Sequence, residues 1–263
     1  MTDNQTQDKP AERRFYDDLF RRRGRFDQFN DSVYERIALE ARTHARGDRL
    51  LELGCGSGAQ AHHLLRAGFS VVALDLSSEA VSLARRSVIE RGGRLPAINA
   101  DAEHLPIGSA TVDVCICGLL LHHFRSLELV ASEIRRVLRP GGLLVAIDAN
   151  AHQPFAWLFL NVLHRLKPRP GMTPNQRALR SSEIVDVFGR RGFRDFRFSS
   201  ITSKLRRDWL GTSLASTMNY YSRASVLELS RILLPEISQG NMLISVCRLG
   251  GDDAEPPPGS TYL

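Results

Sequence analysis

A glutamate and three alternating glycines stand together near residue 50 of the sequence. Residues 50–58 read Leu-Leu-Glu-Leu-Gly-Cys-Gly-Ser-Gly, so that Glu52 ends an apolar run and Gly54, Gly56 and Gly58 follow it. A strand that opens into such a loop brings main chain unusually close to whatever lies above the sheet, because a Cβ would block the approach or resist the dihedrals of the turn. The pattern therefore indicates a small molecule bound at this loop.

Two acidic positions further along narrow the chemistry of that ligand. Asp75 ends the apolar run 70–74, 21 residues after Gly54, where a carboxylate accepts hydrogen bonds from ribose hydroxyls. Asp101 follows the next run and suits an acceptor for an adenine amino group. The pair favours an adenosine-type ligand without a 2′-phosphate. The glycine spacing also fits a dinucleotide fingerprint, so these residues leave two ligand classes open.

Histidines near the ends of two further apolar runs are candidate general bases. His122 and His123 follow the run 112–117, and His152 follows the run 143–148. An imidazole exchanges its proton near neutral pH, which suits acid–base chemistry. For each histidine the sequence favours a structural or substrate-orienting role, with His123 the first candidate for a base. Adjacent histidines make poor joint metal ligands and no third partner is evident, so we predict no metal.

Strands that alternate with helices must position these residues. The hydrophobic pattern predicts strands over residues 49–53, 70–74, 95–99, 112–117 and 143–148, and helices over 59–67, 78–91 and 126–138. This alternation predicts right-handed crossovers and a mainly parallel sheet that binds ligands beyond the carboxyl ends of its strands. A helix over 182–191 and strands over 193–201 and 242–249 are expected to complete the sheet.

The remaining segments are interpreted as additions to one α/β domain at residues 49–249. We expect helices over 11–22, with apolar spacing at Phe15, Leu19 and Phe20, and over 31–45; together they form an N-terminal helical cap at 11–48. Residues 149–180 form a lid-like insertion, and two more helices are plausible between 208 and 234. Residues 1–10 and 250–263 are expected to be disordered.

Composition sets broad limits on partners and location. The net charge is +6, but only three of the 35 basic residues are lysines, and the arginines are scattered along helices as well as clustered at Arg21–Arg25. Solvated helix faces explain this better than a polyanion partner. The four cysteines lack metal-ligand spacing and are expected to be buried and reduced. Without an apolar leader or a run of about 20 apolar residues, we expect a cytoplasmic protein.

Five motifs taken together resemble one large family. They are LLELGCGSG (50–58), LDLS (74–77), NADAEHLP (99–106), DVCICGLLLHH (113–123) and LRPGGLLVAID (138–148). The set is similar to the class I S-adenosylmethionine-dependent methyltransferases, particularly the small-molecule branch of quinone-biosynthesis enzymes (methyltransferase type 11). The resemblance implies a Rossmann-like, doubly wound, seven-stranded sheet, mostly parallel with an antiparallel C-terminal strand. A short-chain dehydrogenase is disfavoured, because no lysine follows a tyrosine by four residues.

The resemblance also implies a cofactor site for S-adenosylmethionine. By position, the residues around the methionine part are Glu52, Gly54, Cys55 and Gly56; those at the ribose are Asp75 and Leu76; those at the adenine are Asp101 and Ala102; and those near the methyl group are Cys117 and Gly118. Methyl transfer from a sulfonium depends mainly on alignment, and a base is needed only for a weakly acidic acceptor.

The additions to the core are expected to build the acceptor site. The aromatic and apolar side chains from Phe155 to Leu160 would form a lid over the methyl donor, and further aromatic area comes from Tyr16, Phe26, Phe29, Trp209, Tyr220 and Tyr221. These residues predict O- or C-methylation of a small, largely apolar acceptor that is quinone, polyketide, terpenoid or lipid-like. They would equally suit the packing of an appended helix.

Three alternatives stay open for the function. An RNA methyltransferase is disfavoured, because the Asn/Asp-Pro-Pro-aromatic motif of amino-group base methylases is absent after the fourth strand. A protein methyltransferase and a catalytically silent, cofactor-binding regulatory protein are the others. Contact with a membrane surface is compatible with a lipid-like acceptor, and the sequence does not indicate an oligomeric state.

Overall fold

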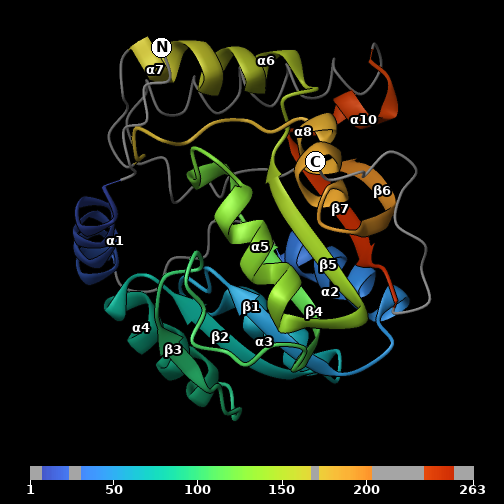
Figure 1. Ribbon diagram of the computed structural model, residues 1–263. Helices are drawn as coiled ribbons and strands as arrows, with labels where there is room; N and C mark the ends of the chain where they lie inside the picture. The colour runs from blue at the N-terminus through green and yellow to red at the C-terminus, as the bar shows by residue number, and fades with distance from the viewer. Residues whose placement is uncertain (1–7, 24–30, 167–171, 203–233, 252–263) are drawn as a thin grey trace.

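The computed structural model describes residues 8–23, 31–166, 172–202 and 234–251 of the chain (Figure 1). Several sequence predictions lie outside these ranges. They are the disorder expected at residues 1–7 and 252–263, the helices expected within 208–234, part of the basic cluster, and the aromatic residues Phe26, Phe29, Trp209, Tyr220 and Tyr221.

In the described ranges, seven strands form one sheet in the order β3-β2-β1-β4-β5-β7-β6. The strands are β1 (Arg49–Leu53), β2 (Ser70–Asp75), β3 (Ala97–Asn99), β4 (Val112–Gly118), β5 (Leu138–Ala149), β6 (Phe193–Ile201) and β7 (Met242–Leu249). β7 is antiparallel to both of its neighbours, and the other pairings are parallel. The predicted mostly parallel sheet with an antiparallel C-terminal strand is confirmed. The strand order reverses between β1 and β4, where such sheets bind ligands.

Helices cover both faces of the sheet, as expected for a doubly wound fold. They are α2 (Asp31–His44), α3 (Ala59–Arg66), α4 (Ser78–Glu90), α5 (Glu128–Val137) and α8 (Ser181–Gly189). One apolar cluster joins α2, α3 and α4 to residues such as Leu50, and the other joins α5 and α8 to residues such as Leu51. Successive strand residues point to opposite faces, so β1 contributes to both clusters.

Two strand boundaries differ from the predicted ones for local reasons. β3 begins at Ala97 rather than Leu95, because Pro96 has no N–H to donate to a sheet ladder. β5 begins at Leu138 rather than Leu143. Val112 of β4 pairs with Leu138 and Val114 with Leu143, so the residues between these two β5 positions bulge out of the ladder. Residues 139–142, which lie between the predicted helix and the predicted strand, are therefore an irregularity inside a longer strand.

The first helix, α1 (Lys9–Arg23), lies beside α4 (Figure 1), and its side chains contact residues that follow β2, β3 and β4. It begins two residues earlier than predicted, so the expectation of disorder through residue 10 is wrong for Lys9 and Pro10. The Asp8 carboxylate accepts a hydrogen bond from the Ala11 N–H at 2.9 Å, as a helix cap does, and Pro10 is tolerated in a first turn. The buried residues of α1 include Glu12 and Phe20, whereas Phe15 and Leu19 are partly exposed.

A helical segment follows β5 and consists of α6 (Pro154–Trp157), the π-helix η2 (Leu158–Leu163) and α7 (His164–Leu166). Its apolar residues Phe155 and Leu166 are 54% and 79% exposed. Asn161 exchanges hydrogen bonds with the main chain of Ala178, and the His164 ring bonds the Thr173 carbonyl at 2.9 Å. Two short elements remain, η1 (Leu121–His123) and α10 (Glu236–Gln239). Within the described ranges, no helix has the length and apolarity needed to cross a membrane.

Candidate active site

The glycine loop after β1 is held against the end of β2 by hydrogen bonds. The N–H of Gly54 donates to the Leu74 carbonyl at 2.8 Å, and the N–H of Gly56 donates to the Asp75 carboxylate at 2.9 Å. Gly54, Gly56 and Gly58 have φ angles of 74°, 49° and 79°, in the left-handed region that favours glycine. The sequence needs glycine here for the turn itself as well as for a bare main chain.

Glu52, at the carboxyl end of β1, is a buried acid with an unused oxygen. It is 1% exposed, and its Oε2 has no hydrogen-bond partner among the described residues. Burial, and then the charge of Asp75, raise the pKa of Glu52 to about 8. A buried acceptor without a donor is costly, so the site fits a ligand that brings a donor, such as the ammonium of the predicted cofactor.

Glu52→Gln is expected to stabilise the cofactor-free protein, with a gain that grows between pH 5 and pH 9. The pKa of Glu52 rises from an ordinary 4.5 to about 8 on folding, so its contribution to stability is full below the ordinary value and is lost as the pH rises through 8. Glutamine carries no charge to bury. We expect a gain of about 2–4 °C in Tm at pH 9, the shift that roughly 1 kcal/mol produces in a domain of this size.

Thermal unfolding followed by circular dichroism at a series of pH values measures this gain. Glu90→Gln is the matched control, because Glu90 is exposed at the end of α4. A Tm difference between Glu52→Gln and wild type that does not change with pH would contradict the assignment of a buried, proton-bearing carboxyl.

Asp75 joins the glycine loop to the start of α4. One carboxylate oxygen accepts from Gly56 and the other from the N–H of Ser77, both at 2.9 Å, and the Ser77 hydroxyl accepts from the Ala80 N–H as the N-cap of α4. Burial raises the pKa of Asp75 and the two backbone hydrogen bonds oppose this shift. Leu76 follows in the same turn. A carboxylate retains further lone pairs, so ribose hydroxyls have acceptors here.

Asp75→Ala is expected to weaken binding of S-adenosylhomocysteine roughly ten- to hundredfold, the cost of one or two hydrogen bonds to a charged group. The carboxylate also accepts the hydrogen bond from Gly56, so part of the loss comes from the loop. Asp75→Asn should lose less, because its amide oxygen still accepts a hydrogen bond. Titration calorimetry measures the affinity, and Asp186→Ala, on exposed helix surface, is the control. Unchanged affinity in Asp75→Ala would remove Asp75 from the site.

The predicted adenine position is already in contact with α1. Asp101 accepts from the N–H of Glu103 at 3.0 Å and from the Lys9 ammonium at 3.3 Å, and Lys9 also pairs with Glu103 at 2.8 Å. The ammonium lies 4.4 Å from the centroid of the Phe124 ring, and Ala102 beside it is 6% exposed. The helix therefore contributes a cation where the sequence predicted only a carboxylate.

The two cysteines predicted at the site face the apolar layers. Cys55 and Cys117 are buried and belong to the two opposite core clusters. Burial raises the pKa of both thiols well above the usual range, so both stay protonated. Only their main chains are suited to contact a cofactor. At Gly118, by contrast, an added Cβ would meet no heavy atom within 4 Å, so open space adjoins the end of β4.

His122 turns inward and is fixed by Asp148. Its Nδ1 lies 2.8 Å from the Asp148 carboxylate, which also accepts from the His122 N–H at 3.1 Å. The N–H of Arg177 donates to the His122 carbonyl at 3.2 Å. Burial lowers the pKa of His122 and raises the pKa of Asp148. These contacts tie η1 to β5 and to the segment before α8, as a structural role requires.

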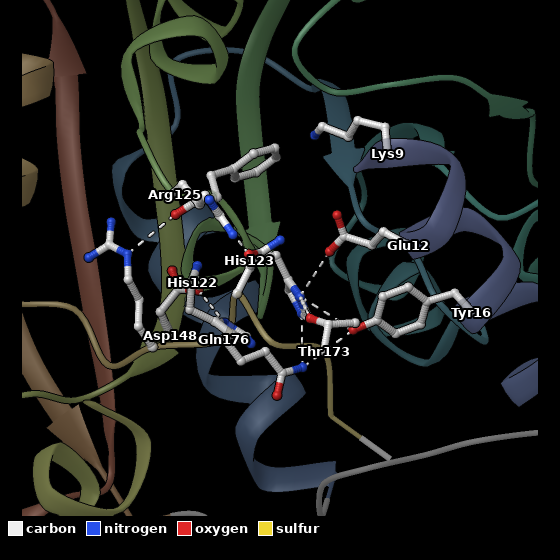
Figure 2. Close-up of polar contacts among 12 residues, drawn as sticks. Lys9, Glu12, Tyr16, His122, His123, Arg125, Asp148, Thr173 and Gln176 are labelled. Carbon is white, nitrogen blue, oxygen red and sulfur yellow. Dashed lines mark hydrogen bonds and ion pairs between the residues drawn. The ribbon is translucent and has the colours of Figure 1, made fainter. Parts of the chain in front are cut away.

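His123 points toward α1 and lies among polar groups from two additions to the core (Figure 2). From α1, the Tyr16 hydroxyl lies 3.3 Å from both ring nitrogens and the Glu12 carboxylate lies 3.5 Å from Nδ1. From the segment before α8, the Thr173 hydroxyl lies 3.4 Å from Nδ1 and the Gln176 amide 3.5 Å from Nε2. Burial, and then His122, lower the pKa of His123, so its imidazole is neutral at pH 7.

His152 serves the start of α8. Its Nε2 accepts from the Ser181 N–H at 3.0 Å, and its own N–H donates to the Asn150 side chain at 2.9 Å. A ring nitrogen used as a helix cap is not available to a substrate, so His152 is separated from the other candidates. Within the described ranges, no group of three or more acidic, histidine or cysteine side chains could hold a metal ion.

The comparisons with known proteins decide the family of the central region. Residues 51–146, from β1 into β5, match a family model described as a methyltransferase domain. Residues 51–146 form a methyltransferase domain. This methyltransferase domain contains the glycine loop, Asp75, Asp101 and His123. Its family is the one that the five sequence motifs indicated, so the predicted resemblance is confirmed.

Named relatives agree with this assignment, and a solved structure shares the fold. The chain is 32% identical over 120 residues to a malonyl-[acyl-carrier protein] O-methyltransferase of Pectobacterium atrosepticum, covering 46% of each protein. It is 28% identical over 145 residues to a ubiquinone biosynthesis O-methyltransferase of Aliivibrio fischeri, covering 54% of the chain and 62% of that protein. The match thus spans only part of these relatives. A SAM-dependent methyltransferase of Archaeoglobus fulgidus shares the fold, with a TM-score of 0.58, 13% identity, and 88% and 98% of the chains covered.

Several residues near His123 lie outside the methyltransferase domain and were missed as site residues. Thr173 and Gln176 carried no signal in the sequence, Glu12 was not considered, and Tyr16 was named only for its aromatic area. One signal was present in α1, since Lys9, Glu12, Tyr16 and Phe20 follow helical spacing along one face. That face mixes charge with aromatic rings, so hydrophobic periodicity did not mark it.

Proposed function

We propose that the chain binds S-adenosylmethionine at the carboxyl ends of β1, β2 and β4 and transfers its methyl group to a small, largely apolar acceptor. The transfer is to oxygen or carbon. The observation that carries this proposal is the juxtaposition of the bare glycine loop with the unpaired Oε2 of Glu52. The relatives support the proposal, because two of them are named O-methyltransferases.

Different residues of the chain would bind different parts of the cofactor. Glu52 and the loop Gly54–Gly56 would hold the methionine part, Asp75 and Leu76 the ribose, and Asp101 with Ala102 the adenine. The main chain of Cys117 and Gly118 would border the methyl group. When bound, S-adenosylmethionine supplies an electrophilic methyl group on a sulfonium that leaves as a neutral thioether. The protein then has to align the acceptor and exclude water.

His123 is the base we assign to acceptors that must lose a proton. It is neutral at pH 7, and its side chain is 13% exposed. It lies in η1, which follows Gly118 and the open space beside that residue. His122 and His152 are committed to Asp148 and to α8, so they are assigned structural roles. A phenol-like hydroxyl or an activated carbon acid fits a base of this strength better than an alkyl alcohol does.

The apolar character of the acceptor is supported by the segment after β5. Phe155, Trp157 and Leu158 are exposed, and the same helical segment is bonded through His164 to Thr173, which reaches His123. We propose that these side chains cover an apolar acceptor as a lid. Basic residues follow at Lys167 and Arg169, which would favour contact with an anionic membrane surface that carries a lipid-like acceptor.

Binding and turnover should be measured separately to test this function. Titration calorimetry with S-adenosylhomocysteine should show binding with one site per chain. S-adenosylmethionine labelled in its methyl group should then label one member of a panel that contains a catechol, a prenylated hydroquinone, a resorcinol and a β-keto thioester. Failure to bind S-adenosylhomocysteine would overturn the proposal. Binding without transfer to this panel, to total RNA or to protein would favour the catalytically silent alternative.

A further inference from the structure

The face of α1 that meets the methyltransferase domain carries an acid beside the proposed base. Glu12 is 8% exposed, and its carboxylate lies 3.5 Å from Nδ1 of His123. The Thr173 hydroxyl approaches the same nitrogen, whereas the Gln176 amide approaches Nε2. A carboxylate can only accept a hydrogen bond, so the Glu12 carboxylate beside Nδ1 favours a proton on that nitrogen. The lone pair is then left on Nε2, where the Tyr16 hydroxyl and the Gln176 amide are the donors that an acceptor hydroxyl would replace.

Contacts at other points fix α1 in place over the site. Toward its first turn, Lys9 bridges Asp101 and Glu103 of the loop after β3. Toward its other end, the Asp17 carboxylate accepts from the Ser77 hydroxyl at 2.6 Å and from the Glu79 N–H at 3.3 Å, at the start of α4. Both anchor points belong to loops that the proposed cofactor would contact. Glu12 lies between them along the helix, so its position depends on those loops.

We propose that Glu12 is a positioning residue for His123: it holds the imidazole in the tautomer with the proton on Nδ1, and α1 thereby completes the base that receives the acceptor proton at Nε2. The inference rests on the proposed function for its role in methyl transfer, but the tautomer itself can be tested without any acceptor. Tyr16 assists from the same helix face, since its hydroxyl contacts the His123 ring and accepts from the Gln176 amide at 3.3 Å.

Other charged groups around His123 set the direction of its titration. From η1 the neighbouring His122 disfavours the imidazolium, and from α1 Glu12 favours it, as does Asp148 of β5. Asp75 of β2 also interacts with His123. Tyr16 has a pKa raised by burial and stays neutral. Loss of the Glu12 charge should therefore lower the pKa of His123, and the neutral side chain should then sample both tautomers.

Nuclear magnetic resonance of protein labelled with ¹⁵N-histidine tests the proposal directly. The ring signals of His123 are assigned by their loss in His123→Gln. In the wild type we expect a protonated Nδ1 and an unprotonated Nε2 above the pKa. In Glu12→Gln the pKa should fall by about one unit, as expected for loss of a nearby opposite charge, and the tautomer preference should weaken. Glu12→Asp should keep the wild-type tautomer.

Asp18→Asn is the matched control, since it makes the same change of a carboxylate to an amide at an exposed position of α1. It should leave both the pKa and the tautomer of His123 unchanged. Wild-type pKa and tautomer in Glu12→Gln would overturn the proposal. If Glu12→Gln fails to fold, the wild type and Glu12→Asp still test the proposal. A proton on Nε2 of His123 in either protein contradicts the assignment. S-adenosylhomocysteine calorimetry on the same samples tests the proposed function independently.

Discussion

Replacing Gly56 by valine is expected to abolish binding of S-adenosylhomocysteine to the folded protein. Gly56 has a φ of 49°, which a β-branched residue rarely adopts, and its N–H donates to Asp75. A Cβ at this position would point toward α1, 3.7 Å from the Phe20 ring, into the space that a ligand under the helix needs. We expect at least a hundredfold loss of affinity, equivalent to about 3 kcal/mol, measured by titration calorimetry.

Gly92→Val separates the effect on the site from backbone strain. Gly92 also has a positive φ, of 79°, but an added Cβ there meets no atom within 4 Å, and the residue lies in the turn after α4. Both variants should lose some thermal stability, because both force a side chain into the left-handed region. Only Gly56→Val should lose ligand affinity. Wild-type affinity in Gly56→Val would refute the assigned geometry of the loop.

His123→Gln is expected to reduce methyl transfer by about 10²- to 10⁴-fold, the usual contribution of a general base, while leaving the affinity for S-adenosylhomocysteine unchanged. Burial keeps the pKa of His123 below its ordinary value of 6.5. In the wild type kcat/KM should therefore rise with pH through an inflection below that value and level off above it. The inflection should be missing in His123→Gln. The measurement uses the panel acceptor that the wild type methylates.

His44→Gln serves as the control, because His44 ends α2, its ring lies 3.5 Å from the Glu40 carboxylate of the same helix, and its carbonyl accepts a hydrogen bond from Arg248. It should retain the wild-type rate and pH profile. Equal rates in His123→Gln and wild type would mean that the acceptor reaches the enzyme already ionised or that another group takes its proton.

The methyltransferase domain could be predicted closely because its signals are local. Each strand that ends in a functional residue is an apolar run closed by an acid or a glycine, as at Glu52 and Asp75, and parallel strands bring those ends to one edge. The serine cap of α4 at Ser77 is equally local. β7 was predicted as an apolar run, whereas its antiparallel direction was expected only from the family resemblance. These elements need no knowledge of distant contacts.

The acceptor side could not be predicted in the same way, because its residues come from distant segments with no motif. Glu12 and Gln176 meet at His123 only because α1 and the segment before α8 both pack against η1. Hydrophobic spacing in α1 pointed to Phe15 and Leu19, yet the helix buries Glu12 because its partners at the sheet edge are polar. Burial of a carboxylate among hydrogen-bonding groups does not appear in the hydrophobic periodicity of a sequence.

The position of α1 carries a consequence for how acceptor preference changes between related proteins. The carboxylates proposed to hold the nucleoside lie within residues 51–146, whereas Glu12, Tyr16, Thr173 and Gln176 lie in flanking segments. Replacement of these flanking segments should therefore change the preferred acceptor, an alcohol or a carbon acid, while the residues proposed to bind the methyl donor stay the same. Chimaeras that carry the corresponding helix of another protein in place of α1, with the anchors at Lys9 and Asp17 preserved, should take on the acceptor selectivity of that protein.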